Sequence, residues 1–169
     1  MTRTLILTRH AKSSWDTAGM PDHDRPLNAR GRRSAVAIGQ WLRAKGLVPD
    51  QVLCSSARRT RETYERMGFD TPAEVTDTLY LVTANQILRE LSEATGDTVL
   101  LLGHSPGIGQ FAAEILGEPP DHPKFDAYPT GATLIARFDI DSWEKLAWRG
   151  GAVVDFVVPR ELLGEQTEE

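Results

Sequence analysis

Two short apolar segments of this chain are each followed by a histidine. Thr4–Thr8 precedes Arg9 and His10, and Thr98–Leu102 is followed by a glycine and then His104. Short apolar runs of this kind are typical of strands that are buried on both faces. In an open α/β sheet, ligands bind at the carboxyl ends of the strands. We therefore expect the arginine and the two histidines to meet at one edge of a sheet, where they would suit an anion such as phosphate.

Helix and strand patterns alternate along the rest of the chain. We expect helices over 29–45, 57–67, 85–95 and 108–116, and further strands over 51–54, 73–76, 133–139 and 152–158. Asn28 is expected to cap the first helix and Gly46 to end it, while Ser55 or Ser56 caps the second. The pattern predicts a three-layer α/β sandwich with a mostly parallel central sheet, and the last two strands are expected to form an antiparallel edge.

Size and composition limit the classes of protein that this chain can belong to. With 169 residues, 40% of them hydrophobic, it is expected to form one domain over residues 1–160 and an acidic C-terminal tail over 161–169. The net charge of -5 argues against a nucleic-acid partner. No apolar run approaches the roughly 20 residues that cross a membrane. A single cysteine, Cys54, allows no intramolecular disulfide, and a cytoplasmic location is expected.

A third basic group follows the predicted strand over 51–54. The segment from Ser55 to Thr63 holds Arg58, Arg59 and Arg61 in the first turns of a predicted helix. An arginine there would lie near the same sheet edge, and the helix N-terminus adds positive potential. Arg58 and Arg59 are both candidates on this reasoning.

Four segments resemble the motifs of the histidine phosphatase (phosphoglycerate mutase-like) superfamily, and they occur in the same order. They are Arg9-His10, then Asp24-Arg25-Pro26-Leu27 with Gly31, then Ser55 with Arg59 and Thr63, and finally Gly103-His104. The short chain looks most similar to the SixA-like phosphohistidine phosphatases within that superfamily. The resemblance favours Arg59 over Arg58, because Arg59 lies four residues after Ser55. It also implies a phosphoglycerate mutase-like fold.

The resemblance implies a mechanism as well. His10 would be the nucleophile that becomes a phosphohistidine, and Arg9, Arg59 and His104 would bind the phosphate and stabilise the transition state. No metal and no cofactor is implied. The substrate would be a phosphohistidine on a partner protein, or else a small phosphorylated molecule, with phosphate or another oxyanion able to occupy the pocket. Lys12, Trp15 and Thr130 are candidates for the pocket entrance, although Trp15 could equally be core and turn chemistry could explain Thr130.

The general acid is the point at which the sequence departs from the larger relatives, which carry an acidic residue for an alkoxide leaving group. Asp77 is the nearest candidate, and Asp22 and Asp24 are others. A missing acid would matter less for a phosphoramidate, because an imidazole leaves more easily than an alkoxide.

Other functions remain open at this stage. Gly103-His104-Ser105-Pro106-Gly107 matches the nucleophile elbow of serine hydrolases, with Ser105 as nucleophile and His122 as the only downstream histidine. Two objections apply, because Pro106 has no N–H for the oxyanion hole and His122 lies in a Pro-rich segment. A non-catalytic phosphate-binding module and a mutase are further alternatives; the chain lacks the insertion that builds the site of the mutases.

Overall fold

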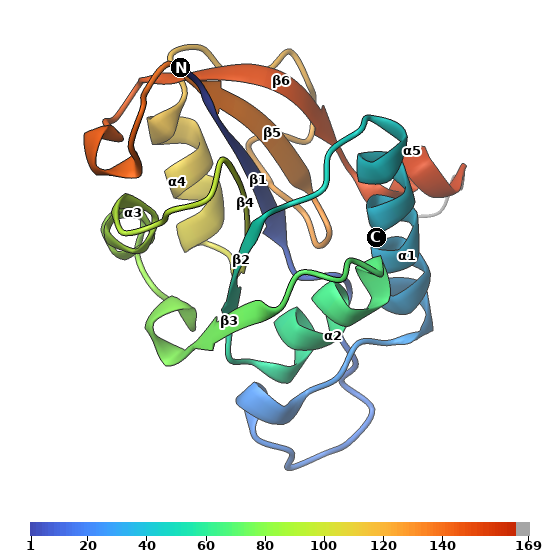
Figure 1. Cartoon of the computed structure of the whole chain (residues 1–169). Coiled ribbons are helices and arrows are strands. Elements are labelled where there is room, and N and C mark those ends of the chain that lie inside the picture. Colours follow the sequence, from blue (N-terminus) through green and yellow to red (C-terminus); the bar gives the residue numbers. More distant parts are fainter. Residues whose placement is uncertain (165–169) are drawn as a thin grey trace.

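A six-stranded sheet forms the centre of the computed structural model, which describes residues 1–164 (Figure 1). Its order is β3-β2-β4-β1-β5-β6. The first four strands in this order are parallel, and β5 and β6 are antiparallel, so the expected mixed sheet with an antiparallel edge is confirmed. The strands are β1 (Arg3–Arg9), β2 (Gln51–Ser55), β3 (Ala73–Thr76), β4 (Thr98–Gly103), β5 (Thr133–Phe138) and β6 (Gly151–Val157).

Helices cover both faces of this sheet. On one face lie α1 (Ala29–Ala44), α2 (Arg58–Met67) and α5 (Pro159–Leu163), and on the other lie α3 (Ala84–Ser92) and α4 (Gly107–Ile115) (Figure 1). Residues 1–164 also form three short 3-10 helices, η1 (Asp22–Asp24), η2 (Asp77–Leu79) and η3 (Trp143–Lys145).

Side chains of β1 alternate between the two cores, as the two-residue period of a strand requires. Ile6 packs with Ile38 and Leu42 of α1, whereas Leu5 and Leu7 pack with α3 and α4 on the opposite face. All three β1 residues are completely buried. The apolar run is therefore a buried strand, as predicted, and it lies between β4 and β5 in the sheet.

The helix ends agree with the sequence in one case and differ in another. The side chain of Asn28 accepts a hydrogen bond from the N–H of Gly31, and Gly46 adopts a φ of +75° just after the helix. For α2 the expected serine cap is wrong, because the N-cap is Ala57 and no side chain caps it. The hydroxyl of Ser55 instead contacts His104.

The C-terminal segment departs from the expected tail over 161–169. Residues 159–163 form α5, and Leu162 packs against the core beside α1. Glu161 accepts a hydrogen bond from the N–H of Val158 at 3.0 Å. An expected domain end at residue 160 therefore falls inside a helix, and residues 165–169 lie outside the described part of the chain.

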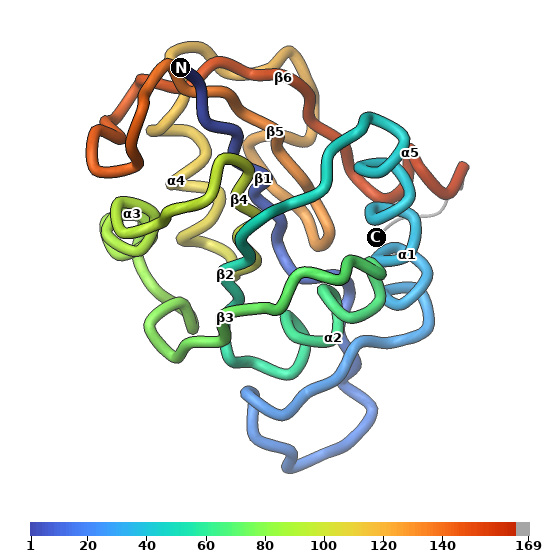
Figure 2. Tube along the Cα trace, in the orientation of Figure 1, coloured from blue at the N-terminus to red at the C-terminus, as the bar shows by residue number. Residues whose placement is uncertain are grey.

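The sheet order explains how distant motifs meet. β1 is the neighbour of β4, with Arg9 opposite Gly103, and β4 is the neighbour of β2. The carboxyl ends of these three strands lie at one edge, where antiparallel β5 begins. Figure 2 shows the loop between β1 and α1 running from this edge past α2. Within residues 1–164, no helix is long and apolar enough to cross a membrane.

Gly31 lets the start of α1 approach the segment that follows His10. A Cβ atom at Gly31 would lie 2.0 Å from the carbonyl oxygen of Lys12, a distance that no side chain can tolerate. Beside it, the N–H of Asn28 donates to the same carbonyl at 3.0 Å. Gly31, the glycine of the second motif, therefore allows two backbone segments to pack closely.

Candidate active site

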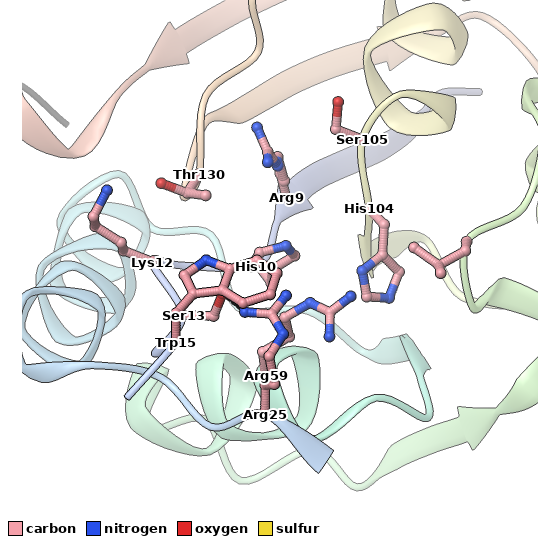
Figure 3. A pocket seen from close by; sticks show the side chains of 11 residues that line it. Arg9, His10, Lys12, Ser13, Trp15, Arg25, Arg59, His104, Ser105 and Thr130 are labelled. Carbon is pink, nitrogen blue, oxygen red and sulfur yellow. Dashed lines mark hydrogen bonds between the residues drawn. The ribbon is translucent and has the colours of Figure 1, made fainter. Parts of the chain in front are cut away.

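A pocket opens at the carboxyl edge of the sheet (Figure 3). Its walls come from the ends of β1 and β4, from α2, from the loop after β1 and from the turn before β5. The lining residues are Arg9, His10, Lys12, Ser13, Trp15, Arg25, Arg59, Leu81, His104, Ser105 and Thr130. The residues that the sequence placed at this edge therefore line one pocket, namely Arg9, His10, Arg59 and His104.

His10 presents one ring nitrogen to the pocket. Its Nδ1 lies 2.7 Å from the carbonyl oxygen of Ala11, which can only accept, so Nδ1 carries the proton. Burial lowers the pKa of His10 well below its usual value, and the positive charges of Arg9 and Arg59 lower it further. The imidazole is therefore neutral at pH 7, and the lone pair on Nε2 is available as a nucleophile.

Residues of α2 hold the His10 segment in place. Thr63 accepts a hydrogen bond from the N–H of Ala11 at 3.0 Å and donates one to the carbonyl of Arg59 at 2.7 Å. Glu62 accepts a hydrogen bond from the N–H of Leu27 at 2.9 Å. The motif that contains Arg59 therefore also fixes both ends of the loop after β1.

His104 lies beside His10, with the ring centroids 5.4 Å apart. Its Nε2 is 2.7 Å from the hydroxyl oxygen of Ser55, and its Nδ1 is buried with no partner among the described residues. Burial lowers the pKa of His104 to about 3, and the charge of Arg59 contributes. His104 is neutral at pH 7 as well.

Arg9 and Arg59 both line the pocket, and each has an N–H donor without an acceptor among the described residues. Arg9 donates to the carbonyl of Tyr128 at 3.1 Å, and Arg59 donates to the carbonyl and the carboxylate of Asp22 at 2.8 and 3.0 Å. The Nε atoms of both arginines are buried and make no hydrogen bond within the described residues. Burial and the charge of Arg59 lower the pKa of Arg9. Buried donors without acceptors, next to like charges, are the arrangement that an anion would stabilise.

Asp22 lies beside this cationic group, although it does not line the pocket. It accepts hydrogen bonds from Arg59, from Arg25 and from the hydroxyl of Tyr80. Burial raises the pKa of Asp22, but the hydrogen bonds from Tyr80 and Arg59 outweigh that effect and bring the pKa to about 2. The carboxylate is thus ionised at neutral pH and is a poor proton donor.

The other residues singled out from the sequence lie as follows. Lys12, Trp15 and Thr130 line the pocket, and Trp15 is 76% exposed, so it is not a core residue. Arg58 is exposed and faces a separate hollow beside Arg61 and Glu65, so Arg59 is the arginine at the pocket. Asp77 is exposed in η2 and is absent from the pocket wall, and Asp24 is also exposed.

Four residues at or beside the pocket were given no role from the sequence, and one of them is Ser13, whose hydroxyl accepts a hydrogen bond from Arg25 at 2.7 Å. Arg25 stood in the quoted Asp-Arg-Pro-Leu segment without a role, and its guanidinium carbon lies 3.5 Å from the centre of the Trp15 ring. Tyr80 and Leu81 lie in the connection between η2 and α3, which carries no recognisable motif. Only the folded chain brings Tyr80 to Asp22.

The serine hydrolase alternative is not supported by the geometry. Ser105 lines the pocket, but Pro106 provides no N–H. The candidate base, His122, has its Nε2 2.8 Å from a carboxylate oxygen of Glu161 and packs against Phe156. No hydrogen bond joins Ser105 to a histidine within residues 1–164.

The fold and the pocket define an α/β protein with a pocket lined by arginine and histidine side chains at the carboxyl edge of its sheet. Residues 5–80 match the model of the histidine phosphatase superfamily (branch 1). An uncharacterized protein of Mycobacterium tuberculosis is 36% identical over 160 residues, which cover 90% of this chain and 99% of the relative.

Solved structures agree with this match. A protein from Nakamurella multipartitia assigned as the phosphohistidine phosphatase SixA superposes with a TM-score of 0.82 and 32% identity, over 94% of this chain and 97% of that one. The protein histidine phosphatase SixA in complex with tungstate superposes with a TM-score of 0.77 and 25% identity, over 94% and 99%. The chain belongs to the histidine phosphatase superfamily, and it is a phosphatase.

Proposed function

We propose that this protein removes the phosphoryl group from a phosphohistidine on a partner protein, without a metal ion, and that His10 is the nucleophile. Arg9, Arg59 and His104 bind the phosphoryl oxygens. The neutral Nε2 of His10 at the floor of a cationic pocket supports this assignment. The tungstate bound by a SixA relative is an oxyanion of similar shape, which also supports it.

The reaction has two steps. The lone pair of His10 Nε2 attacks phosphorus and forms a P–N bond, while the bond from phosphorus to the substrate imidazole breaks. That imidazole takes a proton from a water molecule, and the hydroxide left behind is neutralised in the second step by a proton from the attacking water. A water oxygen then attacks the phosphohistidine, its P–N bond breaks, and phosphate leaves with His10 neutral again. The arginines and His104 stabilise negative charge on the equatorial oxygens in both steps.

One observation carries the choice of a P–N substrate. The pocket wall contains no carboxylic acid among the described residues, and Asp22, the carboxylate that pairs with the pocket residues Arg59 and Arg25, is held ionised by them and by Tyr80. An alkoxide leaving group needs a proton from a strong acid as it departs, whereas an imidazole needs much less help. The charge distribution therefore favours a phosphoramidate over a phosphomonoester.

Lys12 favours a second candidate, a small phosphomonoester that carries another anionic group. Lys12 lines the pocket and forms no ion pair with any described residue. Its ammonium group would suit a carboxylate or a second phosphate on a small substrate. If this second candidate were correct, the rate of hydrolysis of a small phosphomonoester with a second anionic group would exceed that of a phosphohistidine protein.

Single-turnover labelling tests the proposal. A protein labelled on its phosphohistidine is mixed with the enzyme, the reaction is quenched in alkali, and the label is mapped. Acid-labile and alkali-stable phosphate on His10 is the expected result, lost in His10→Ala and kept in Ser105→Ala. EDTA should leave turnover unchanged. If no label and no phosphate release appeared with either this substrate or an aryl phosphate, the chain would be a phosphate-binding module.

A further inference from the structure

We propose that Ser55 sets the tautomer of His104, so that the ring presents an N–H from Nδ1 to the phosphoryl group. Ser55 would then be a positioning residue that acts through His104. This inference rests on the proposed function in one respect, that the pocket binds a phosphoryl group. The geometry on which it stands belongs to the protein without substrate.

The sheet brings the two side chains together. Ser55 ends β2 and His104 follows β4, and these strands are parallel neighbours with Cys54 opposite Leu102. Ser55 is completely buried and His104 is 4% exposed. Their contact, 2.7 Å between Oγ and Nε2, is therefore shielded from water and is a strong hydrogen bond.

The direction of that hydrogen bond follows from counting protons. A serine hydroxyl has one proton and two lone pairs. One lone pair accepts from the N–H of Ala57 at 3.4 Å, and no acceptor other than His104 lies within hydrogen-bond distance of the hydroxyl in the described chain. If Nε2 carried the proton, both the buried hydroxyl proton and the buried lone pair of Nδ1 would lack partners, whereas with the proton on Nδ1 only the Nδ1–H lacks one, so this second arrangement costs less free energy. The hydroxyl therefore donates, and Nε2 accepts.

A neutral imidazole with a bare Nε2 carries its proton on Nδ1. Burial lowers the pKa of His104 to about 3, so the ring holds only one proton at pH 7. Its Nδ1 is buried, has no partner among residues 1–164, and belongs to a ring that lines the pocket (Figure 3). Like Arg9 Nε and Arg59 Nε, His104 Nδ1 is a buried donor with no acceptor among the described residues.

The opposite tautomer of His104 would weaken binding of the phosphoryl group. A lone pair on Nδ1 would face the phosphoryl oxygens and repel them, and the ring would add nothing to binding. His10 has the same protonation pattern, but its Nδ1–H is turned to the Ala11 carbonyl and its Nε2 lone pair is available. Two neutral histidines thus offer opposite chemistry to one phosphoryl group, a nucleophile from His10 and a donor from His104.

Nitrogen-15 NMR of histidine-labelled protein tests the tautomer directly. In the wild-type protein at pH 7 we expect a protonated-type shift for His104 Nδ1 and a bare-type shift for Nε2. Ser55→Ala should shift His104 toward the other tautomer. Ser56→Ala is the matched control, because Ser56 Oγ lies 2.8 Å from His23 Nε2, outside the pocket wall, and should leave the His104 signals unchanged.

Inhibition of turnover by inorganic phosphate gives the functional readout. Ser55→Ala should weaken phosphate inhibition by about 10-fold or more, because the hydrogen bond from His104 Nδ1–H to the charged phosphate would be lost. In a His104→Ala background the same change should have no further effect on phosphate binding, whereas a merely structural role would add its own loss.

The outcomes separate this inference from the proposed function. If His104 in the wild-type protein carried its proton on Nε2, the inference would be wrong whatever the activity, even if Ser55→Ala failed to fold. If the tautomer were as stated but His10→Ala still turned over substrate, the proposed mechanism would fail and the role of Ser55 would stand.

Discussion

Arg59 and Asp22 form an ion pair at 3.0 Å between a side chain that is 3% exposed and one that is 43% exposed. The carboxylate comes from η1 in the loop after β1, and the guanidinium comes from α2. Asp22 accepts two of the N–H groups of Arg25 as well. The loop therefore places one negative charge next to the cations that would bind a phosphoryl group.

Removal of that charge should strengthen anion binding. In Asp22→Asn the amide keeps the size of the side chain but no longer repels phosphate, so the inhibition constant of phosphate should fall by about 3- to 10-fold at low salt. Asp24→Asn is the control, because Asp24 lies in the same 3-10 helix and, within residues 1–164, contacts no basic side chain other than His23, whose Nδ1 lies 3.8 Å from its carboxylate. Weaker phosphate inhibition in Asp22→Asn alone would instead mean that Asp22 mainly orients Arg59.

The pH dependence of turnover should report a neutral nucleophile. Burial lowers the pKa of His10 well below the usual histidine value, and the same cause lowers the pKa of His104 to about 3. Because kcat/KM reports the free enzyme, its acid limb should lie well below pH 6.5 after correction for ionisation of the substrate. An aryl phosphate serves as substrate, since it survives acid. A half-maximal point at pH 6.5 would contradict a buried neutral His10.

The stability of the fold should fall as the solution is acidified. Both pocket histidines have folded-state pKa values below the unfolded value of 6.5, so below about pH 7 the unfolded chain binds more protons than the native one. Each such histidine contributes a slope of up to about 1.4 kcal/mol per pH unit. We expect urea unfolding to show lower stability at pH 5 than at pH 7, with a smaller difference in His104→Gln. Asp22 adds a further loss of stability only below about pH 4, because its pKa falls from 3.8 in the unfolded chain to about 2 in the folded protein.

The parts of the fold and site that follow local rules could be predicted from the sequence. The short apolar runs before His10 and His104 predicted buried strands, and Asn28 and Gly46 marked both ends of α1. Parallel strands then required that the residues after them share one edge.

The parts that failed depend on contacts between distant segments. Ser55 looked like a helix cap, but its hydroxyl is used by His104 on the neighbouring strand. Asp77 was the first candidate for the general acid, with Asp22 and Asp24 as the others, and the carboxylate beside the pocket is Asp22, which accepts a hydrogen bond from Tyr80 just after η2. No local pattern reports such pairings, because each is set by how η1, η2 and α2 pack.

Trp15 should distinguish a protein substrate from a small one. Its ring is 76% exposed at the pocket mouth, and one face is stacked on the guanidinium of Arg25. Arg25 is itself held by Asp22 and by the hydroxyl of Ser13, so the aromatic ring is positioned before any substrate arrives. Exposed, ordered aromatic side chains of this kind are frequent anchors for protein partners.

We expect Trp15→Ala to lower kcat/KM on a phosphohistidine protein by about 10-fold, through KM, because the anchoring contact is lost. The same variant should hydrolyse phosphoramidate, which carries no polypeptide to contact the exposed ring, within about 2-fold of the wild-type rate. Val48→Ala is the control, since Val48 is 59% exposed but precedes β2, at the edge of the sheet away from the pocket. Equal losses on both substrates would place Trp15 in the support of the pocket, and no loss on either would remove it from substrate recognition.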